Sequence, residues 1–366
     1  MTVFKKFVKK YFSPSEEIGA RVNNFNVIRM IAAAMVIYGH MAHIMGLPVH
    51  TIYGQAVSSI AVKMLFILSG YLIMKSLIND SHFGRYMLRR SFRIFPGLIG
   101  VVLFAVFIVG PVATSLSLKE YFLSYGTWVY LRNIVLYPIY SLPGVFGNYT
   151  YPNAVNGSLW TLPVEFSLYL VLPALLVVFK KLKIVKWGLF VTTVVCIVGG
   201  YLRLKFPEVR FVFYGSNLPD ALAILPYFFA GSFLALPEFK KYFNLQIAVF
   251  LMFVTAIFRF SSTKYEILLC VILPYAVLSF ALTERPVFSK WFAKSDFTYG
   301  LYLYGFVIQQ LVHHQLAKLN SSVFSLNITF AICFVLTFVC AVISWYLIEK
   351  PMQILCKKIL NMSYKK

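Results

Sequence analysis

The sequence predicts an all-α polytopic membrane protein with about ten transmembrane helices and both termini on the cytoplasmic side. Hydrophobic residues make up 60% of the 366 residues and charged residues only 13%, and the mean hydropathy is +0.77. This composition is more apolar than that of soluble globular proteins and leaves no room for a large soluble domain. Apolar stretches long enough to cross the hydrocarbon layer also recur along the whole chain.

Ten apolar stretches separated by polar or basic segments form the predicted spans, of which the fifth and seventh are the shortest. No internal repeat or low-complexity linker divides them, so we expect one membrane domain over 27–348. It is preceded by a cytoplasmic segment, 1–26, and followed by a basic cytoplasmic tail, 349–366. The spans are predicted over 27–47, 56–76, 95–115, 158–179, 187–202, 220–237, 245–260, 265–283, 297–317 and 326–348.

The basic residues orient this series of spans, because Lys and Arg accumulate on cytoplasmic loops. An even number of spans places both termini on one side, and taking that side as cytoplasmic gives it most of the 34 Lys and Arg residues. Topology and anionic lipid at the inner surface then account for most of the net charge of +22. We therefore predict membrane lipid, and no nucleic acid, as a partner. The first apolar run is predicted to be a retained span rather than a cleaved signal peptide.

The first span carries two ionisable side chains, Arg29 and His40. Charge in hydrocarbon is costly, so an ionisable residue inside a span is a candidate functional group. In a helix the two residues are separated by roughly 16 Å, about half the hydrocarbon thickness. An arginine at the membrane edge would thus lie below a histidine near mid-depth.

The outer segment 115–157 is rich in Tyr, Asn, Gly and Pro and is longer than a turn. It could line an entrance for an extracytoplasmic ligand. The alternative is an aromatic belt at the membrane interface over a connecting loop. The sequence leaves both open.

Four arginines precede the third span: Arg85, Arg89 and Arg93 share one helical face, and Arg90 is adjacent. We expect this stripe to end near Pro96. The planar guanidinium suits phosphate, so the stripe could bind a phosphorylated cytoplasmic ligand such as the nucleotide end of coenzyme A. An anchor that contacts lipid headgroups is the alternative.

Glu165 lies a few residues inside the fourth span, flanked by apolar residues. A buried carboxylate needs a partner or takes up a proton, and His40 and Arg29 are the candidate partners. A structural ion pair between helices is the alternative.

Five cysteines lie in spans or in the tail without metal-ligand spacing, and we predict that they pack as small apolar residues and form no disulfides. They are Cys196, Cys270, Cys333, Cys340 and Cys356.

Taken together, the motifs resemble those of the acyltransferase-3 family of integral membrane acyltransferases. They follow one another along nearly the whole chain, and the combination is specific although each is weak alone. They are the Arg29 and His40 pair, Phe66–Leu72, Arg89–Pro96, Ser158–Glu165 and Glu349–Pro351.

The resemblance implies an O-acyltransferase of the bacterial cytoplasmic (inner) membrane. It would move an acyl group, most simply acetyl, from acetyl-coenzyme A as co-substrate to a hydroxyl of an envelope polysaccharide or its lipid-linked precursor. No permanently bound cofactor is expected, and a homo-oligomer is left open. His40 would act as general base, since an imidazole can take a proton from a hydroxyl that attacks a thioester. Glu165 would orient it or assist proton transfer, and Arg29, Arg90 and Arg93 would bind the donor.

Other roles follow for the remaining motif residues. Ser69 could be a nucleophile activated by His40, although a small residue in a span more often permits close helix packing. We expect Ser69, Tyr71 and Trp160 to line the site. His40 and His43, with Glu165, could imitate a metal site. No third convincing ligand accompanies the two histidines, so no metal is predicted.

One position departs from the family pattern and one different function remains open. Where the family often has a histidine in the ninth span, this chain has Gly305, and His313 and His314 follow further along. A bundle with buried Arg, His and Glu could also be a proton-coupled transporter of sugars or lipid-linked oligosaccharides. No internal repeat or paired interrupted spans support that alternative.

Overall fold

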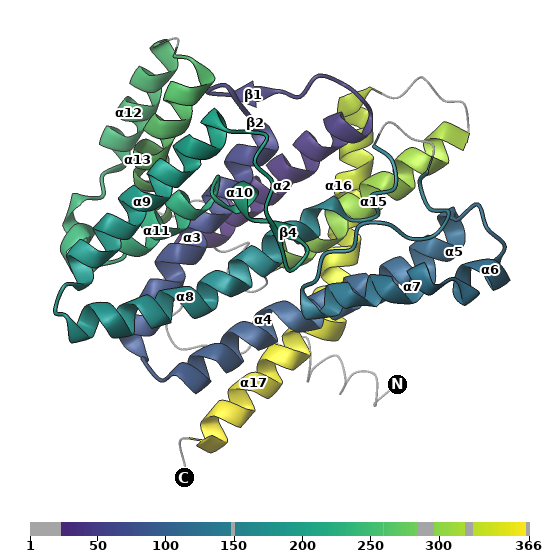
Figure 1. Cartoon of the computed structure of the whole chain (residues 1–366), viewed down its shortest axis with the longest axis horizontal. Coiled ribbons are helices and arrows are strands. Elements are labelled where there is room, and N and C mark those ends of the chain that lie inside the picture. Colours follow the sequence, from purple (N-terminus) through teal and green to yellow (C-terminus); the bar gives the residue numbers. More distant parts are fainter. Residues whose placement is uncertain (1–22, 148–150, 259, 284–295, 319–324, 364–366) are drawn as a thin grey trace, which may run out of the picture.

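The computed structural model describes residues 23–147, 151–258, 260–283, 296–318 and 325–363. They form a bundle of helices with two short β-hairpins (Figure 1), which confirms the all-α fold class. A helix lies at each of the ten predicted spans, and seven helices of the described part are long and apolar enough to cross a membrane. Most of the predicted segment 1–26 lies outside the described residues.

The helices at the ten predicted spans are α2 (Phe25–Ile44), α3 (Val57–Asn79), α4 (Phe83–Phe104), α8 (Thr161–Lys181), α9 (Val185–Lys205), α11 (Leu225–Leu234), α12 (Leu245–Ile257), α13 (Ser262–Ala281), α15 (Thr298–Lys318) and α16 (Leu326–Ser344). The shorter helical segments are η1 (Ala105–Val109), α5 (Gly110–Ala113), α6 (Leu118–Leu123), α7 (Tyr125–Val129), η2 (Tyr130–Val135), η3 (Gly157–Trp160), α10 (Leu218–Ala221), η4 (Pro237–Tyr242), η5 (Trp345–Glu349) and α17 (Lys350–Ser363).

Two antiparallel hairpins close one end of the bundle. Strand β1 (Thr51–Ile52) pairs with β2 (Gln55–Ala56), and β3 (Val212–Phe213) pairs with β4 (Ser216–Asn217). Each has a two-residue Tyr-Gly turn with positive φ at both positions, the geometry that matches the twist of paired strands. We call this the hairpin end.

Span lengths differ from the expectation at two places. The fifth span was expected to be short, but α9 runs over 21 residues. The sixth is interrupted between α10 and α11, and α11 itself has only 10 residues, with Pro226 in its first turn. Proline has no amide hydrogen and is best tolerated in the first turn of a helix, so it favours a new helix here.

The third span also starts earlier than predicted. Helix α4 begins at Phe83 and passes through Pro96 without ending there, so the arginine stripe lies on the spanning helix itself. The helix then continues through the π-helical η1 into α5. Within η1 the carbonyl of Val106 accepts a hydrogen bond from the Tyr121 hydroxyl at 2.9 Å, and a Cβ at Gly110 would overlap that hydroxyl.

The last span likewise continues beyond its predicted end. Helix α16, η5 and α17 are contiguous, so the predicted boundary between domain and tail falls within a helix. Helix α17 lies beside α4 (Figure 1). The part of the tail beyond Ser363 lies outside the described residues.

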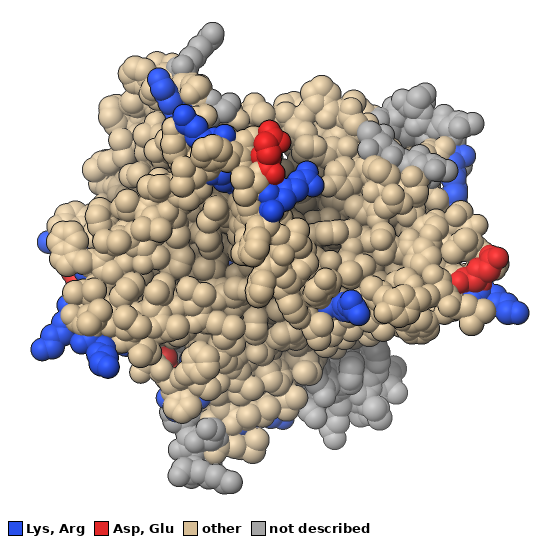
Figure 2. Space-filling model, viewed as in Figure 1, with Lys and Arg blue, Asp and Glu red and all other residues tan. Residues whose placement is uncertain are grey.

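The described chain starts and finishes at the same end of the bundle. The amide of Asn24, just before α2, donates to the carbonyl of Ala281 at the close of α13, at 3.2 Å. This end also holds the start of α4 and helix α17, and we call it the basic end. Charged side chains are few on the face seen in Figure 2, and many large apolar side chains are exposed, as expected of a surface in contact with lipid.

Close packing joins α3 to α11. A Cβ at Gly70 would overlap the carbonyl of Phe228, and one at Gly231 would overlap that of Ile67. Small residues of this kind let helix backbones approach closely inside a membrane. The five cysteines are free, as predicted.

A buried ion pair lies on another face of α3. The ammonium of Lys63 is 2.6 Å from the Oε1 of Glu266 on α13 and donates to Gln55 at 3.1 Å. It also lies 5.2 Å from the ring centre of Tyr227. Lys63 is only 1% exposed, so this pair replaces the water that an isolated charge would need.

Candidate functional site

Two cavities lie along the bundle. The basic-end cavity has a volume of about 110 Å³, and the hairpin-end cavity about 700 Å³. The polar side chains lining the first are Arg29, Ser69, Arg90, Arg93, Thr161, Glu165, Tyr169, Thr298, Tyr299 and Tyr302. Those lining the second include His40, His43, Ser58, Tyr140, Tyr151, Asn153, Trp160, Asn217 and Asp220.

A thin layer of side chains separates the two cavities. On α15, Tyr302 lines the basic-end cavity and Phe306 the hairpin-end cavity. On α3, Val62 lines the basic-end cavity and Ser58 the hairpin-end cavity. Four residues along a helix rise about 6 Å, so the cavities are offset by roughly one helical turn.

Hydrogen bonds join the side chains of this separating layer to the start of α8. The Tyr302 hydroxyl donates to the carbonyl of Ser158 at 2.8 Å and is also paired with the hydroxyl of Thr161. The amide group of Asn156 donates to the carbonyl of Leu303 at 2.9 Å. The turn η3, which begins α8, is therefore fixed to α15 at the level where the cavities approach each other.

His40 lines the hairpin-end cavity. Its ring centre lies 5.3 Å from that of Phe306, edge to face. Trp160 lines the same cavity, and so do Tyr140 and Tyr151 from the outer segment. This placement favours the interpretation of that segment as the lining of an entrance.

The three predicted donor-binding arginines meet at the basic-end cavity. Arg29 comes from α2, and Arg90 and Arg93 come from α4. The Nη2 of Arg93 lies 2.7 Å from the Oδ2 of Asp296, and the Nη1 of Arg29 lies 3.3 Å from the same oxygen. The Nε of Arg90 is buried and has no hydrogen-bond partner among the described residues. Arg90 instead lies against the rings of Tyr86 and Tyr169.

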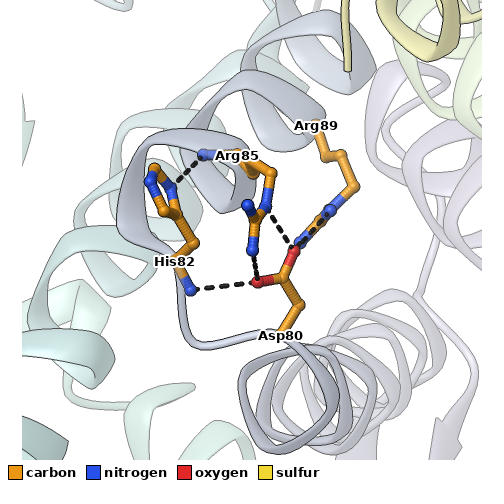
Figure 3. Close-up of polar contacts among 4 residues, drawn as sticks. All are labelled: Asp80, His82, Arg85 and Arg89. Atoms are coloured by element: carbon orange, nitrogen blue, oxygen red, sulfur yellow. Dashed lines mark hydrogen bonds and ion pairs between the residues drawn. The ribbon is translucent and has the colours of Figure 1, made fainter. Parts of the chain in front are cut away.

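The other two arginines of the stripe have a separate partner (Figure 3). Asp80 accepts two hydrogen bonds from Arg85, at 2.7 and 3.0 Å, and two from Arg89, both at 3.1 Å. The hydrogen bonds from Arg85 and the backbone amide of His82 hold the pKa of Asp80 well below its usual value. The stripe thus divides into a pair that stabilises the start of α4 and a pair that lines the cavity.

Glu165 does not meet His40. It lines the basic-end cavity, where it accepts hydrogen bonds from Ser69 at 3.0 Å and from Tyr169 at 2.6 Å. His40 lines the other cavity. The structure therefore shows no contact through which Glu165 could orient the imidazole of His40, and none through which His40 could activate Ser69. Arg29, the other predicted partner of Glu165, shares its cavity.

Tyr71 was predicted to line the site, but it lies outside both cavities. It is buried and stacks on Phe25 with ring centres 5.7 Å apart. The cavity-facing residues of α3 include Ser69 and Leu72, and Tyr71, two positions after Ser69, points about 200° away around the helix. Gly305 also faces away, because a Cβ there would lie 3.0 Å from Ile37 on α2. A histidine at this position would crowd α2.

His40, His43 and Glu165 do not converge on one point, since the first two line one cavity and the third lines the other. Within the described ranges there is no group of three His, Cys, Asp or Glu side chains placed to hold a metal ion.

Comparison with known sequences shows the family of this chain. The profile of the acyltransferase domain of the acyltransferase-3 family matches residues 22–346. The chain belongs to the acyltransferase-3 family. It is therefore an integral membrane acyltransferase.

Named relatives of this acyltransferase-3 protein include an O-acetyl transferase of Shigella phage Sf6, 27% identical over 79% of this chain and 85% of the relative. Nodulation protein 10 of Rhizobium leguminosarum bv. viciae is 29% identical over 46% of this chain and 48% of its own length. The peptidoglycan O-acetyltransferase OatA of Listeria monocytogenes is 29% identical over 33% of this chain and only 20% of its own length. No solved structure matches.

Sequence reasoning missed two parts of this acyltransferase-3 site. Asp296, which pairs with Arg29 and Arg93, carries no local motif and is one of 12 acidic residues. Its one sequence signal is its position directly before an apolar span. Tyr302 of the separating layer lies among several tyrosines of the ninth span, and only the fold distinguishes it from the others.

Proposed function

We propose that this protein transfers an acetyl group from cytoplasmic acetyl-coenzyme A to a hydroxyl of an envelope polysaccharide or of its lipid-linked precursor, in the bacterial inner membrane. The observation that carries the proposal is the pair of cavities. One is lined by three arginines from two helices, and the other by a histidine among aromatic and amide side chains. Phosphate and sugar are the chemical classes that such linings recognise.

The basic-end cavity suits the acyl donor. Arginine binds phosphate through paired N–H groups, and Arg90 brings a guanidinium whose buried Nε has no hydrogen-bond partner among the described residues. A volume of about 110 Å³ admits the acetyl-thioester end of the donor but not its nucleotide. The phosphates would therefore bind at the mouth, on Arg90 and Arg93, with Arg29 nearby.

The hairpin-end cavity suits the acceptor. Its volume of about 700 Å³ falls within the usual range for small-ligand sites, roughly 300–1,000 Å³. Tyr140, Tyr151 and Trp160 offer ring faces, and Asn153 and Asn217 offer amides that can bond to hydroxyls. These groups fit one or two sugar units of a longer glycan.

His40 would then act as general base. Its imidazole takes the proton of the acceptor hydroxyl while the oxygen attacks the thioester carbonyl carbon. The tetrahedral intermediate collapses with cleavage of the carbon–sulfur bond, and the imidazolium returns the proton to the departing thiolate. The thioester has to pass the separating layer first, so the Tyr302 and Thr161 hydroxyls would meet it on its way.

The test uses purified protein in detergent with acetyl-coenzyme A and a lipid-linked oligosaccharide. We expect free thiol to appear only when the acceptor is present, and mass spectrometry to show one added acetyl group on the sugar. A transporter would leave both molecules intact. Thiol release without acceptor modification, or no thiol release at all, would contradict the proposal.

The arginine stripe provides a matched pair of variants. Arg90→Gln should raise the KM for acetyl-coenzyme A about tenfold, because a hydrogen bond between charged groups contributes roughly 1.5–3 kcal/mol. Arg85→Gln also removes one positive charge from α4, but Arg85 is hydrogen-bonded to Asp80. Its KM should stay within about twofold of wild type. Steady-state titration of the donor measures both, and equal effects would argue for a diffuse electrostatic role of the stripe.

A further inference from the structure

Asp296 joins two arginines from different helices. Its Oδ2 accepts a hydrogen bond from Arg93 of α4 at 2.7 Å and one from Arg29 of α2 at 3.3 Å. The Asp296 side chain is 18% exposed and each arginine side chain 25%. One carboxylate oxygen therefore fixes both guanidinium groups in a partly buried place.

Asp296 contacts residues that line the basic-end cavity but does not line the cavity itself. Arg29, Arg93 and Thr298 line the basic-end cavity, and Asp296 does not. Its second oxygen, Oδ1, is held by the hydroxyl of Thr298 in the first turn of α15. A ligand in the cavity would therefore meet the arginines and would not compete with this carboxylate.

Charge keeps this arrangement in place. Burial opposes ionisation of Asp296, but the guanidinium groups of Arg93 and Arg29 outweigh it and lower its pKa to about 2. The carboxylate is thus anionic at neutral pH. Without it, two guanidinium groups of like charge would face each other across a site of low dielectric constant, and each would gain by turning away.

We propose that Asp296 is a positioning residue that holds Arg29 and Arg93 in the orientation that receives the phosphates of the acyl donor. This inference rests on the proposed function. Each arginine also has a second, electrostatic carboxylate neighbour, Glu349 for Arg93 and Glu165 for Arg29, but Arg29 lies farther from the Asp296 oxygen, at 3.3 Å against 2.7 Å for Arg93. Loss of Asp296 should therefore release Arg29 more completely than Arg93.

The experiment compares the steady-state kinetics of Asp296→Asn and wild type at varied acetyl-coenzyme A and saturating acceptor. The asparagine keeps the size of the side chain but removes its charge. We expect the KM for acetyl-coenzyme A to rise about tenfold and the inhibition constant of free coenzyme A to rise in parallel. The kcat should change less than about threefold. Asp296→Glu keeps the charge and should keep the KM within about threefold of wild type.

Asp80→Asn is the matched control. Asp80 also holds two arginines of α4 through one carboxylate (Figure 3), but none of the three lines either cavity. Its KM should be unchanged. Should Asp296→Asn not fold, Thr298→Ala removes the hydroxyl that fixes the carboxylate and should raise the KM about threefold.

Two results would overturn the inference while leaving the proposed function intact. One is a lower kcat with unchanged KM, which indicates only a loss of folded enzyme. The other is a lower KM, which would mean that Asp296 repels the donor. Failure of the wild-type protein to use acetyl-coenzyme A would instead contradict the proposed function.

Discussion

Replacing His40 by alanine should lower kcat for acetyl transfer by about 10²- to 10⁴-fold, the usual contribution of a general base. At about 1.4 kcal/mol for each factor of ten, this is a loss of roughly 3–6 kcal/mol of transition-state stabilisation. The KM for acetyl-coenzyme A should change little, because His40 lines the hairpin-end cavity and the donor arginines line the other. Acceptor-dependent thiol release at varied donor concentration measures both constants.

His50→Ala is the matched control for this experiment. His50 also belongs to the hairpin end and pairs with Tyr38 at 3.3 Å, but it does not line the cavity that holds His40. Its activity should equal that of wild type. If His40→Ala keeps more than a tenth of the wild-type kcat, His40 is not the base. Ser69→Ala then becomes the next variant, with a search for an acetylated enzyme by intact mass.

Replacing Lys63 by methionine should lower the free energy of unfolding by about 3–5 kcal/mol, because the change leaves the buried carboxylate of Glu266 without its partner. Methionine fills nearly the same volume, so lost packing contributes little. Denaturant unfolding in mixed micelles, followed by tryptophan fluorescence, measures the change. Neither Lys63 nor Glu266 lines the two cavities, so kcat for each folded molecule should be unchanged.

Two further variants separate charge from packing at this pair. Lys63→Met combined with Glu266→Gln removes both charges and should recover at least half of the lost stability. Arg203→Met breaks the exposed pair with Asp220, whose side chains are 34% and 44% exposed, and should cost less than about 1 kcal/mol. A Lys63→Met variant as stable as Arg203→Met would show that the buried pair contributes no more than a surface one.

Much of the fold could be predicted because a membrane imposes length and apolarity on each span separately. The ten predicted stretches all contain helices, and Arg29 and His40, both on α2, line different cavities. The breaks could not be predicted in this way. The π-helical turn η1 accepts a hydrogen bond from the Tyr121 hydroxyl, which comes from another segment, and Gly97, next to Pro96 in α4, lies against Tyr299 of α15.

The site was harder to predict because its contacts join distant parts of the chain. Arg29 was found as an ionisable residue inside a span, and Arg90 and Arg93 from the arginine stripe and the family motif. Asp296 is 267 residues from Arg29 and 203 from Arg93, and hydropathy does not tell which spans adjoin. The expected contact of Glu165 with His40 was wrong for the same reason. Depth along each helix, rather than charge complementarity alone, decides which polar groups can meet.

The separating layer also bears on the bilayer itself. A continuous passage lined by arginine, histidine and carboxylate would conduct protons and small ions and dissipate the membrane potential. It would also let external water hydrolyse the activated acyl group. Instead, one turn of side chains lies between the cavities, fixed to the start of α8 by the Tyr302 hydroxyl, and we expect it to limit both ion leak and loss of the acyl group to water.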